Sequence, residues 1–73
     1  MKIDANGDNV RDFIDYWEGR PRSTHKSLGR RFHSAAAFIA RADLRRGKTH
    51  GSVAAQTILR NAANRHERLG DER

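Results

Sequence analysis

The apolar residues of this chain recur at the spacing of an α-helix, and this period limits the folds that the sequence can adopt. The first segment has four apolar residues at positions i, i+3, i+4 and i+7: Val10, Phe13, Ile14 and Trp17. This spacing places them on one face of a helix. Asp8 is a suitable N-cap before the segment. Gly19 and Pro21 are expected to end the helix near residue 18.

Two longer segments have the same period. Residues from about Ser27 to Arg46 place five apolar residues on one helix face: Leu28, Phe32, Ala35, Ile39 and Ala42. Gly29 costs about 1 kcal/mol in a helix interior, so this helix could start as late as Arg31. After the loop RRGKTHGS, Ser52 is expected to cap a third helix over about residues 53–68, ended by Gly70. Its predicted apolar face comprises Ala55, Ile58, Leu59, Ala62, His66 and Leu69.

The sequence therefore predicts a small all-α domain of three helices, with a helical core over residues 8–69. No segment alternates apolar and polar residues over the length of a convincing strand. Residues 1–7 are expected to form a flexible N-terminal arm, and residues 70–73 a flexible tail. Many predicted core positions are alanine, which buries little apolar surface. A core this thin in 73 residues is expected to be completed by a partner.

The net charge of +6 is concentrated in the middle of the chain. Residues 21–50 contain eight basic residues and one acidic residue, Asp43, which gives this segment a net charge of +7. Helical spacing places Arg30, Arg41 and Arg45 together, nearly opposite the apolar face. Such a surface attracts nucleic acid or an acidic protein. Because guanidinium groups bind phosphate and carboxylate equally well, the charge leaves DNA, RNA and protein open.

The aromatic residues divide between predicted core and predicted surface. Phe13 and Trp17 are expected in the core, although a ring at the last turn, such as that of Trp17, can be half exposed; Tyr16 is expected on the surface. Phe38 lies a quarter turn from the apolar face and is expected to be buried, because a middle helix can bury two faces. Leu44 is expected to cover the loop. Aromatic and arginine side chains often anchor interfaces. The predicted partner-binding residues are Tyr16, Trp17, Arg20, Arg22, Arg30, Arg31, Phe38, Arg41 and Arg45.

Catalysis, metal binding and cofactor binding find little support in the sequence. There is no cysteine, and no phosphate loop of the GxxxxGK kind. No two of the four histidines have the i, i+4 spacing that places two ligands on one helix face: His25, His33, His50 and His66. His66 is expected at the edge of the core. We therefore expect a non-enzymatic protein with no catalytic residues, metal or cofactor.

A small basic DNA- or RNA-binding domain is the alternative function. The second and third helices could form a helix-turn-helix in which Gln56 and Thr57 read bases. The loop after Leu44, however, is longer than the usual turn of 3–4 residues in that motif. The segment SVAAQT also offers few side chains that read bases.

The sequence also predicts a cytoplasmic protein. No apolar run approaches the ~20 residues that cross a bilayer. The N-terminal MKIDANGDN lacks the apolar segment of a signal peptide. We expect a monomer with no membrane contact.

The segments DNVRDFIDYWEGRPR and RRFHSAAAFIARADLRRGKTHGS, in a chain of this size, resemble a small transcription regulator encoded by a Xanthomonas phage. Regulators of this type inhibit bacterial RNA polymerase and act as antiterminators. The resemblance spans the whole chain and implies a protein of the host cytoplasm that binds the polymerase β and β′ subunits near the RNA exit channel. It further implies σ displacement during initiation, suppression of termination and a possible contact with nascent RNA or DNA. No contact residue can be assigned from a motif shared with these regulators.

Overall fold

The structure consists of three helices that pack side by side. The computed structural model describes residues 1–47 and 50–71. The helices are α1 (Val10–Glu18), α2 (His25–Arg46) and α3 (His50–Asp71). The predicted all-α class with three helices is therefore confirmed. In the described residues, no helix combines the length and the apolar character that a lipid bilayer requires of a spanning segment.

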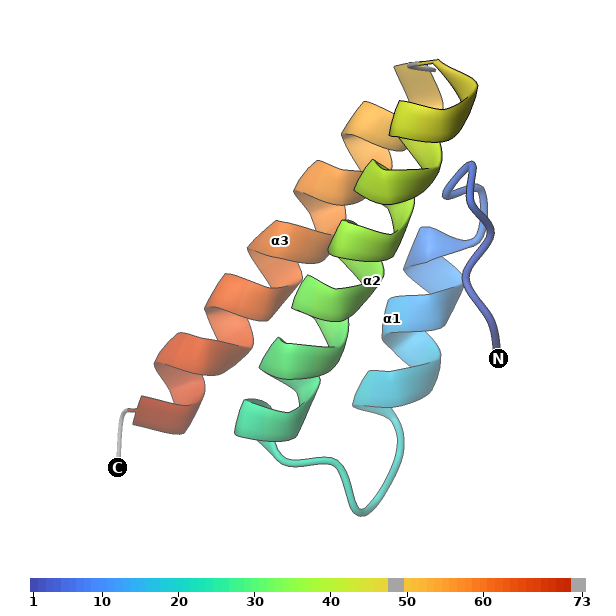
Figure 1. Ribbon diagram of the computed structural model, residues 1–73. Coiled ribbons are helices and arrows are strands. Elements are labelled where there is room, and N and C mark those ends of the chain that lie inside the picture. Colours follow the sequence, from blue (N-terminus) through green and yellow to red (C-terminus); the bar gives the residue numbers. More distant parts are fainter. Residues whose placement is uncertain (48–49, 72–73) are drawn as a thin grey trace.

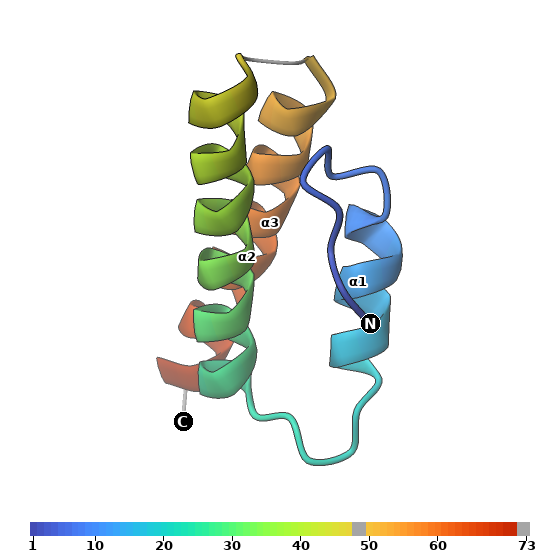
Figure 2. The same ribbon diagram turned by 45° about the vertical axis from the view of Figure 1, so that its right-hand side comes forward.

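An antiparallel hairpin of α2 and α3 forms the body of the molecule (Figures 1 and 2). Each of these helices has 22 residues. The shorter α1, with 9 residues, lies alongside the N-terminal part of α2. The molecule is consequently elongated, with extents of 41 × 21 × 14 Å.

The core lies between the two long helices and is closed on one side by α1. Phe32, Ile39 and Leu59 are fully inaccessible to solvent. The ring of Phe13 from α1 meets that of Phe32 edge-on, with 6.2 Å between the ring centroids. The remaining buried apolar residues are mainly small: Val10, Ile14, Leu28, Ala35, Ala36, Ala55, Ala62 and Ala63. The small alanine side chains let the helices approach closely. Most of these buried residues lie on the apolar faces that the sequence period predicts.

The predicted helix starts are wrong by a few residues. The side chain of Thr24 accepts a hydrogen bond of 3.0 Å from the backbone N–H of Ser27, so α2 begins at His25. The N-cap of α1 is Asn9 rather than Asp8. In α1 the observed cap lies next to the predicted one, whereas in α2 it lies three residues before the predicted start.

The predicted start and end of α3 are also wrong. Ser52 is not a cap: it lies inside α3 and is buried. The helix continues past Gly70 to Asp71. The segment between α2 and α3 is therefore limited to residues 47–49, shorter than the predicted loop. The last residues of the predicted tail, 72–73, lie outside the described residues.

Gly29 does not delay the start of α2, because it is a packing position. A Cβ atom at this residue would lie 3.0 Å from Cγ of Glu67 and 3.4 Å from the carbonyl oxygen of Ala63. The missing side chain therefore allows α3 to pass close to α2. The cost of glycine in a helix is offset here by that close contact.

Phe38 and Leu44 are exposed, contrary to prediction. Phe38 is 44% exposed and Leu44 is 85% exposed. Leu69, placed on the predicted apolar face of the third helix, is exposed as well. The expectation that α2 buries a second face fails at Phe38 because α1 is short and no described segment covers this part of α2.

The N-terminal arm contains no helix but is attached to the rest of the molecule. The side chain of Asn9 accepts a hydrogen bond of 2.9 Å from the N–H of Asp4 and donates one of 2.6 Å to the carbonyl oxygen of Lys2. Ile3 is half-buried against the core. The predicted flexibility of the arm stays a prediction, whereas this attachment was not foreseen.

Gly7 provides the tightest contact of the arm. Its φ of 77° lies in the left-handed region, and a Cβ atom would lie only 2.3 Å from Cβ of Ala55. Both features require glycine, so this residue is the point at which the arm fits against α3.

We expect Gly7→Ala to lower the free energy of unfolding by about 1–3 kcal/mol, because it adds backbone strain and a clash. Gly47→Ala is the matched control: its φ is 79°, but no atom lies within 4 Å of the added Cβ. Urea unfolding measures the two losses, and hydrogen exchange in residues 1–9 measures release of the arm. Release in both variants, or in neither, would contradict the attachment described above.

Candidate functional site

Four of the predicted partner-binding residues gather at the corner between α1 and α2. We call this group, Tyr16, Trp17, Arg20 and Arg31, the indole cluster. The guanidinium carbon of Arg31 lies 3.6 Å from the ring centroid of Trp17, and that of Arg20 lies 4.6 Å from it. Arg20 also donates a hydrogen bond of 3.1 Å to the hydroxyl of Tyr16. Two cations are thus held against one indole ring.

The local sequence explains this arrangement. Tyr16 and Trp17 occupy the last turn of α1, and their rings meet edge-on at 5.4 Å. The chain turns at Gly19, whose N–H donates to the carbonyl oxygen of Asp15 at 3.0 Å, and Arg20 therefore lies back over the rings. Tyr16 is 43% exposed, as predicted, and Trp17 is half-buried.

The two guanidinium groups of the indole cluster lie against aromatic rings rather than carboxylates. In the part of the chain that the structure describes, neither Arg20 nor Arg31 takes part in an ion pair. Each cation–π contact contributes about 0.5–1 kcal/mol at an exposed site, which is enough to orient a guanidinium group but leaves its charge available. The cluster therefore combines exposed aromatic surface with a positive potential.

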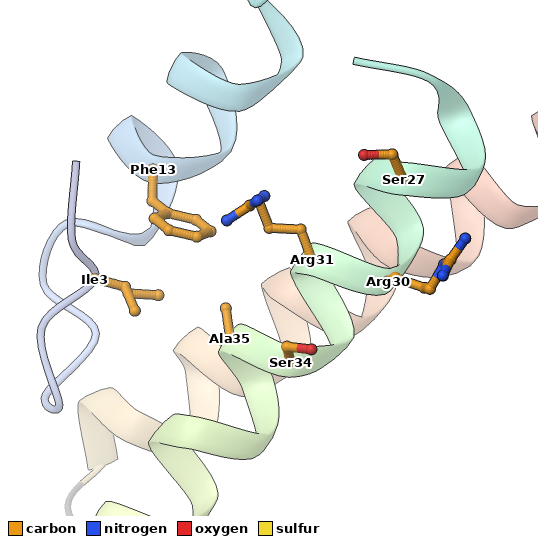
Figure 3. A pocket seen from close by; sticks show the side chains of 7 residues that line it. All are labelled: Ile3, Phe13, Ser27, Arg30, Arg31, Ser34 and Ala35. Carbon is orange, nitrogen blue, oxygen red and sulfur yellow. The ribbon is translucent and has the colours of Figure 1, made fainter. Parts of the chain in front are cut away.

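A groove of about 590 Å³ opens beside the indole cluster, between the arm, α1 and α2 (Figure 3). Ile3, Phe13 and Ala35 provide its apolar lining. Arg31 extends toward Phe13, whereas its neighbour Arg30, which also lines the groove, extends away from Phe13. Two arginines and two serines complete the lining, so a groove of mixed polarity lies beside the indole cluster.

The other predicted arginines form a stripe along α2. At about 100° per residue, six exposed residues between positions 30 and 45 of α2 fall within an arc of about 100°. They are Arg30, Arg31, Ser34, Phe38, Arg41 and Arg45, which we call the arginine stripe. Arg31 belongs to both groups. Arg22, in contrast, lies exposed in the connection between α1 and α2.

The acidic residue nearest to this stripe in sequence is turned inward. Asp43 is only 8% exposed, and Nε2 of Gln56 donates a hydrogen bond of 2.8 Å to its carboxylate. The stripe therefore carries no carboxylate. Gln56, which the sequence analysis considered as a base-reading residue, is already engaged within the fold.

The helix-turn-helix alternative does not fit the fold. The argument from loop length was wrong, since the connection comprises residues 47–49. However, α2 and α3 lie side by side along their length, whereas the helices of that motif cross at about 90–120°. With α3 packed along α2 in this way, neither helix is presented as a separate recognition helix.

Sequence analysis missed a hydrogen-bonded series of titratable side chains that joins all three helices. Nε2 of His66 in α3 lies 2.5 Å from Oε2 of Glu18 in α1. Nδ1 of His66 lies 2.9 Å from Nδ1 of His25 in α2. The centroids of the two imidazole rings are 5.1 Å apart, with 26° between the ring planes. With the nitrogen atoms so close, the rings must meet edge to edge.

The valence of imidazole dictates how this series is protonated. Only one hydrogen can lie between the two Nδ1 atoms, so one ring donates and the other accepts. His66 donates from Nε2 to the ionised carboxylate of Glu18, and at 6% exposure it is largely shielded from water. In the described residues, no group of three or more His, Cys, Asp or Glu side chains is placed to hold a metal ion. The contacts of His66 with Glu18 and His25 link α3 to α1 and to α2.

Electrostatics favour the ionised form of Glu18. Partial burial raises the pKa of this carboxyl, but the hydrogen bonds from His66 and Arg65 lower it, and their charges lower it further. The net result is a pKa below the ordinary value of 4.5. Arg65 contributes through an ion pair of 2.7 Å. Because His25 and His66 are 41 residues apart, only the register of the helices could have revealed this site.

Comparison with known proteins does not identify the chain. It matches no protein-family model, no curated protein and no solved structure.

We expect Arg31→Ala to lower the free energy of unfolding by about 0.5–1 kcal/mol, since it removes the closer guanidinium contact with Trp17. Trp17 is the chain's only tryptophan, so its fluorescence emission should shift as well. Arg30→Ala is the control, because Arg30 extends away from Phe13 and the guanidinium groups on the Trp17 ring are those of Arg20 and Arg31; its effect should stay within about 0.5 kcal/mol. Equal losses of unfolding free energy in the two variants would mean that the contact between Arg31 and Trp17 does not stabilise the fold.

Glu18→Gln should lower the free energy of unfolding at pH 7 by up to about 1 kcal/mol, the range of partly exposed ion pairs. Because the folded pKa of Glu18 is lowered, its stabilisation is complete above the unfolded value of 4.5 and is lost as the pH falls through the folded pKa. The difference between wild type and variant should therefore shrink below pH 4.5 in urea titrations.

Asp15→Asn removes an exposed carboxyl from the same helix and serves as the control for this experiment. It should leave the pH dependence of stability nearly unchanged. If the difference between wild type and Glu18→Gln were the same at pH 3 and pH 7, the link through Glu18 would not stabilise the fold.

Proposed function

We propose that this chain is a non-enzymatic transcription regulator of the phage-encoded type, which binds bacterial RNA polymerase through the corner between α1 and α2. The observation that carries the proposal is the indole cluster. Two guanidinium groups that lack a carboxylate partner in the described chain lie against Trp17, beside the exposed Tyr16. Aromatic and arginine residues of this kind dominate the binding energy of many protein interfaces.

The corner has the composition of a protein interface. The groove beside the indole cluster is lined by Ile3, Phe13 and Ala35 together with two arginines and two serines, and its apolar part can form a desolvated centre. Arg20 and Arg31 form its charged rim. Interfaces commonly combine an apolar centre with a polar rim. The partner surface that fits is apolar with carboxylates around it.

The resemblance in sequence supplies the identity of that partner. It implies the β and β′ subunits near the RNA exit channel. A basic protein bound there would occupy subunit surface needed by σ factor and thereby inhibit initiation. During elongation, the same position would place its positive charge near the emerging RNA, where it could suppress termination.

The test is binding to purified core RNA polymerase that has been treated with nuclease. Tyr16→Ala combined with Arg20→Glu should weaken binding at least tenfold, because it removes one ring and reverses one charge of the cluster. Val53→Ala combined with Arg60→Glu makes the same kinds of change at exposed residues of α3 and should bind like wild type.

Transcription assays then test the consequence of binding. Wild type should reduce σ-dependent initiation and increase read-through at an intrinsic terminator, while the Tyr16→Ala, Arg20→Glu variant should do neither. Loss of polymerase binding after nuclease treatment would overturn the proposal. So would equal weakening by the cluster variant and its α3 control.

A further inference from the structure

We infer that the arginine stripe of α2 binds single-stranded nucleic acid, with phosphates on its guanidinium groups and an unpaired base stacked on Phe38. This inference does not rest on polymerase binding. It concerns the outward face of α2, and it can be tested on naked nucleic acid.

The first support is the uncompensated charge. Of the described arginines, Arg65 alone takes part in an ion pair, so Arg30, Arg41 and Arg45 have no carboxylate partner there. Asp43 is buried within the hairpin and adds no carboxylate to this surface. The stripe runs from residue 30 to residue 45, a length of about 22 Å at 1.5 Å per residue. Its length and charge suit the backbone of an extended strand.

The second support is the position of Phe38. Its ring is 44% exposed, and Arg41 and Arg45 follow it at i+3 and i+7 on the same face. A protein interface places its apolar residues together and excludes charge from their centre. Here a single exposed ring shares its face with two arginines, and no other large apolar residue belongs to the stripe. Base stacking beside phosphate contacts fits this pattern better, because each nucleotide presents a flat base next to an anion.

The geometry also distinguishes single strands from duplexes. A base can stack on an external ring only if it is not stacked within a duplex. Arginine can both hold phosphate through its planar fork and stack on a base. Apart from the arginines, Ser34 is the stripe's one polar side chain, so few groups can read base edges. Binding is therefore expected to tolerate many sequences, and RNA and DNA offer the same chemistry.

Fluorescence anisotropy tests the inference with labelled 12-nucleotide oligouridine and oligothymidine, a 12-base-pair DNA duplex, and unlabelled polyglutamate as competitor. We expect single strands to bind more tightly than the duplex. Three phosphate contacts predict a slope of about −2 for the logarithm of affinity against the logarithm of salt concentration. Tighter binding of either single strand supports the inference and identifies whether the transcript or a melted DNA strand is the better ligand.

Arg41→Glu combined with Arg45→Glu should weaken single-strand binding more than tenfold and flatten the salt dependence. The matched control is Arg60→Glu with Arg68→Glu, which makes the same charge change at exposed residues of α3. Equal losses in both variants would show that only net charge matters, and the stripe would be the wrong assignment.

Phe38→Ala separates stacking from charge. Because the ring is exposed, circular dichroism should show an unchanged helix content, whereas single-strand affinity should fall about tenfold. The concentration of polyglutamate that displaces half of the oligonucleotide should be the same for the Phe38→Ala variant as for wild type. Leu44→Ala, on the same helix but outside the stripe, is the control. Unchanged affinity of the Phe38→Ala variant would overturn the inference. Equal affinity for the duplex and for single strands would also overturn the inference. Stronger competition by polyglutamate than by unlabelled oligouridine would overturn it in favour of an acidic protein as the partner.

Discussion

The close contact between α2 and α3 is the constraint on which the rest of the structure depends. With few large apolar residues, the chain gains burial by bringing two long helices together through alanine and Gly29 rather than by filling a wide core. Phe32, Ile39 and Leu59 become fully buried only at this short separation. α1 then needs to cover one side of the hairpin, which leaves the outward face of α2 open to solvent.

This division of α2 into two faces also separates the charges. The inward face accepts Asp43 because Gln56 is placed to donate a hydrogen bond to its carboxylate. The outward face keeps the arginines, which repel one another and gain from a polyanionic or acidic partner. At the N-terminal end of α2, Arg31 instead reaches the indole of Trp17. The helix α2 thus contributes both to the indole cluster and to the arginine stripe.

Much of the fold could be predicted from periodicity, because the spacing of Phe32, Ile39 and Leu59 reflects burial directly. Helix ends could not, since neighbouring polar residues such as Asp8 and Asn9 compete for the cap and packing decides between them. The exposed Tyr16 and the outward arginines were predicted correctly from their position off the apolar stripes. The exposure of Phe38 and the pairing of His25 with His66 depend on helix length and register, which a single sequence does not encode locally.

The hairpin also has a consequence for the order in which the chain folds. Contacts between α2 and α3 near residues 47–49 join residues close in sequence, so the hairpin can form early at a small cost in chain entropy. α1 joins through contacts such as Glu18 to His66, which are separated by 48 residues. We therefore expect the link from Glu18 to His66 to form after the hairpin and to open early in local unfolding. Surfaces that adapt to a partner are commonly drawn from such regions of low local stability.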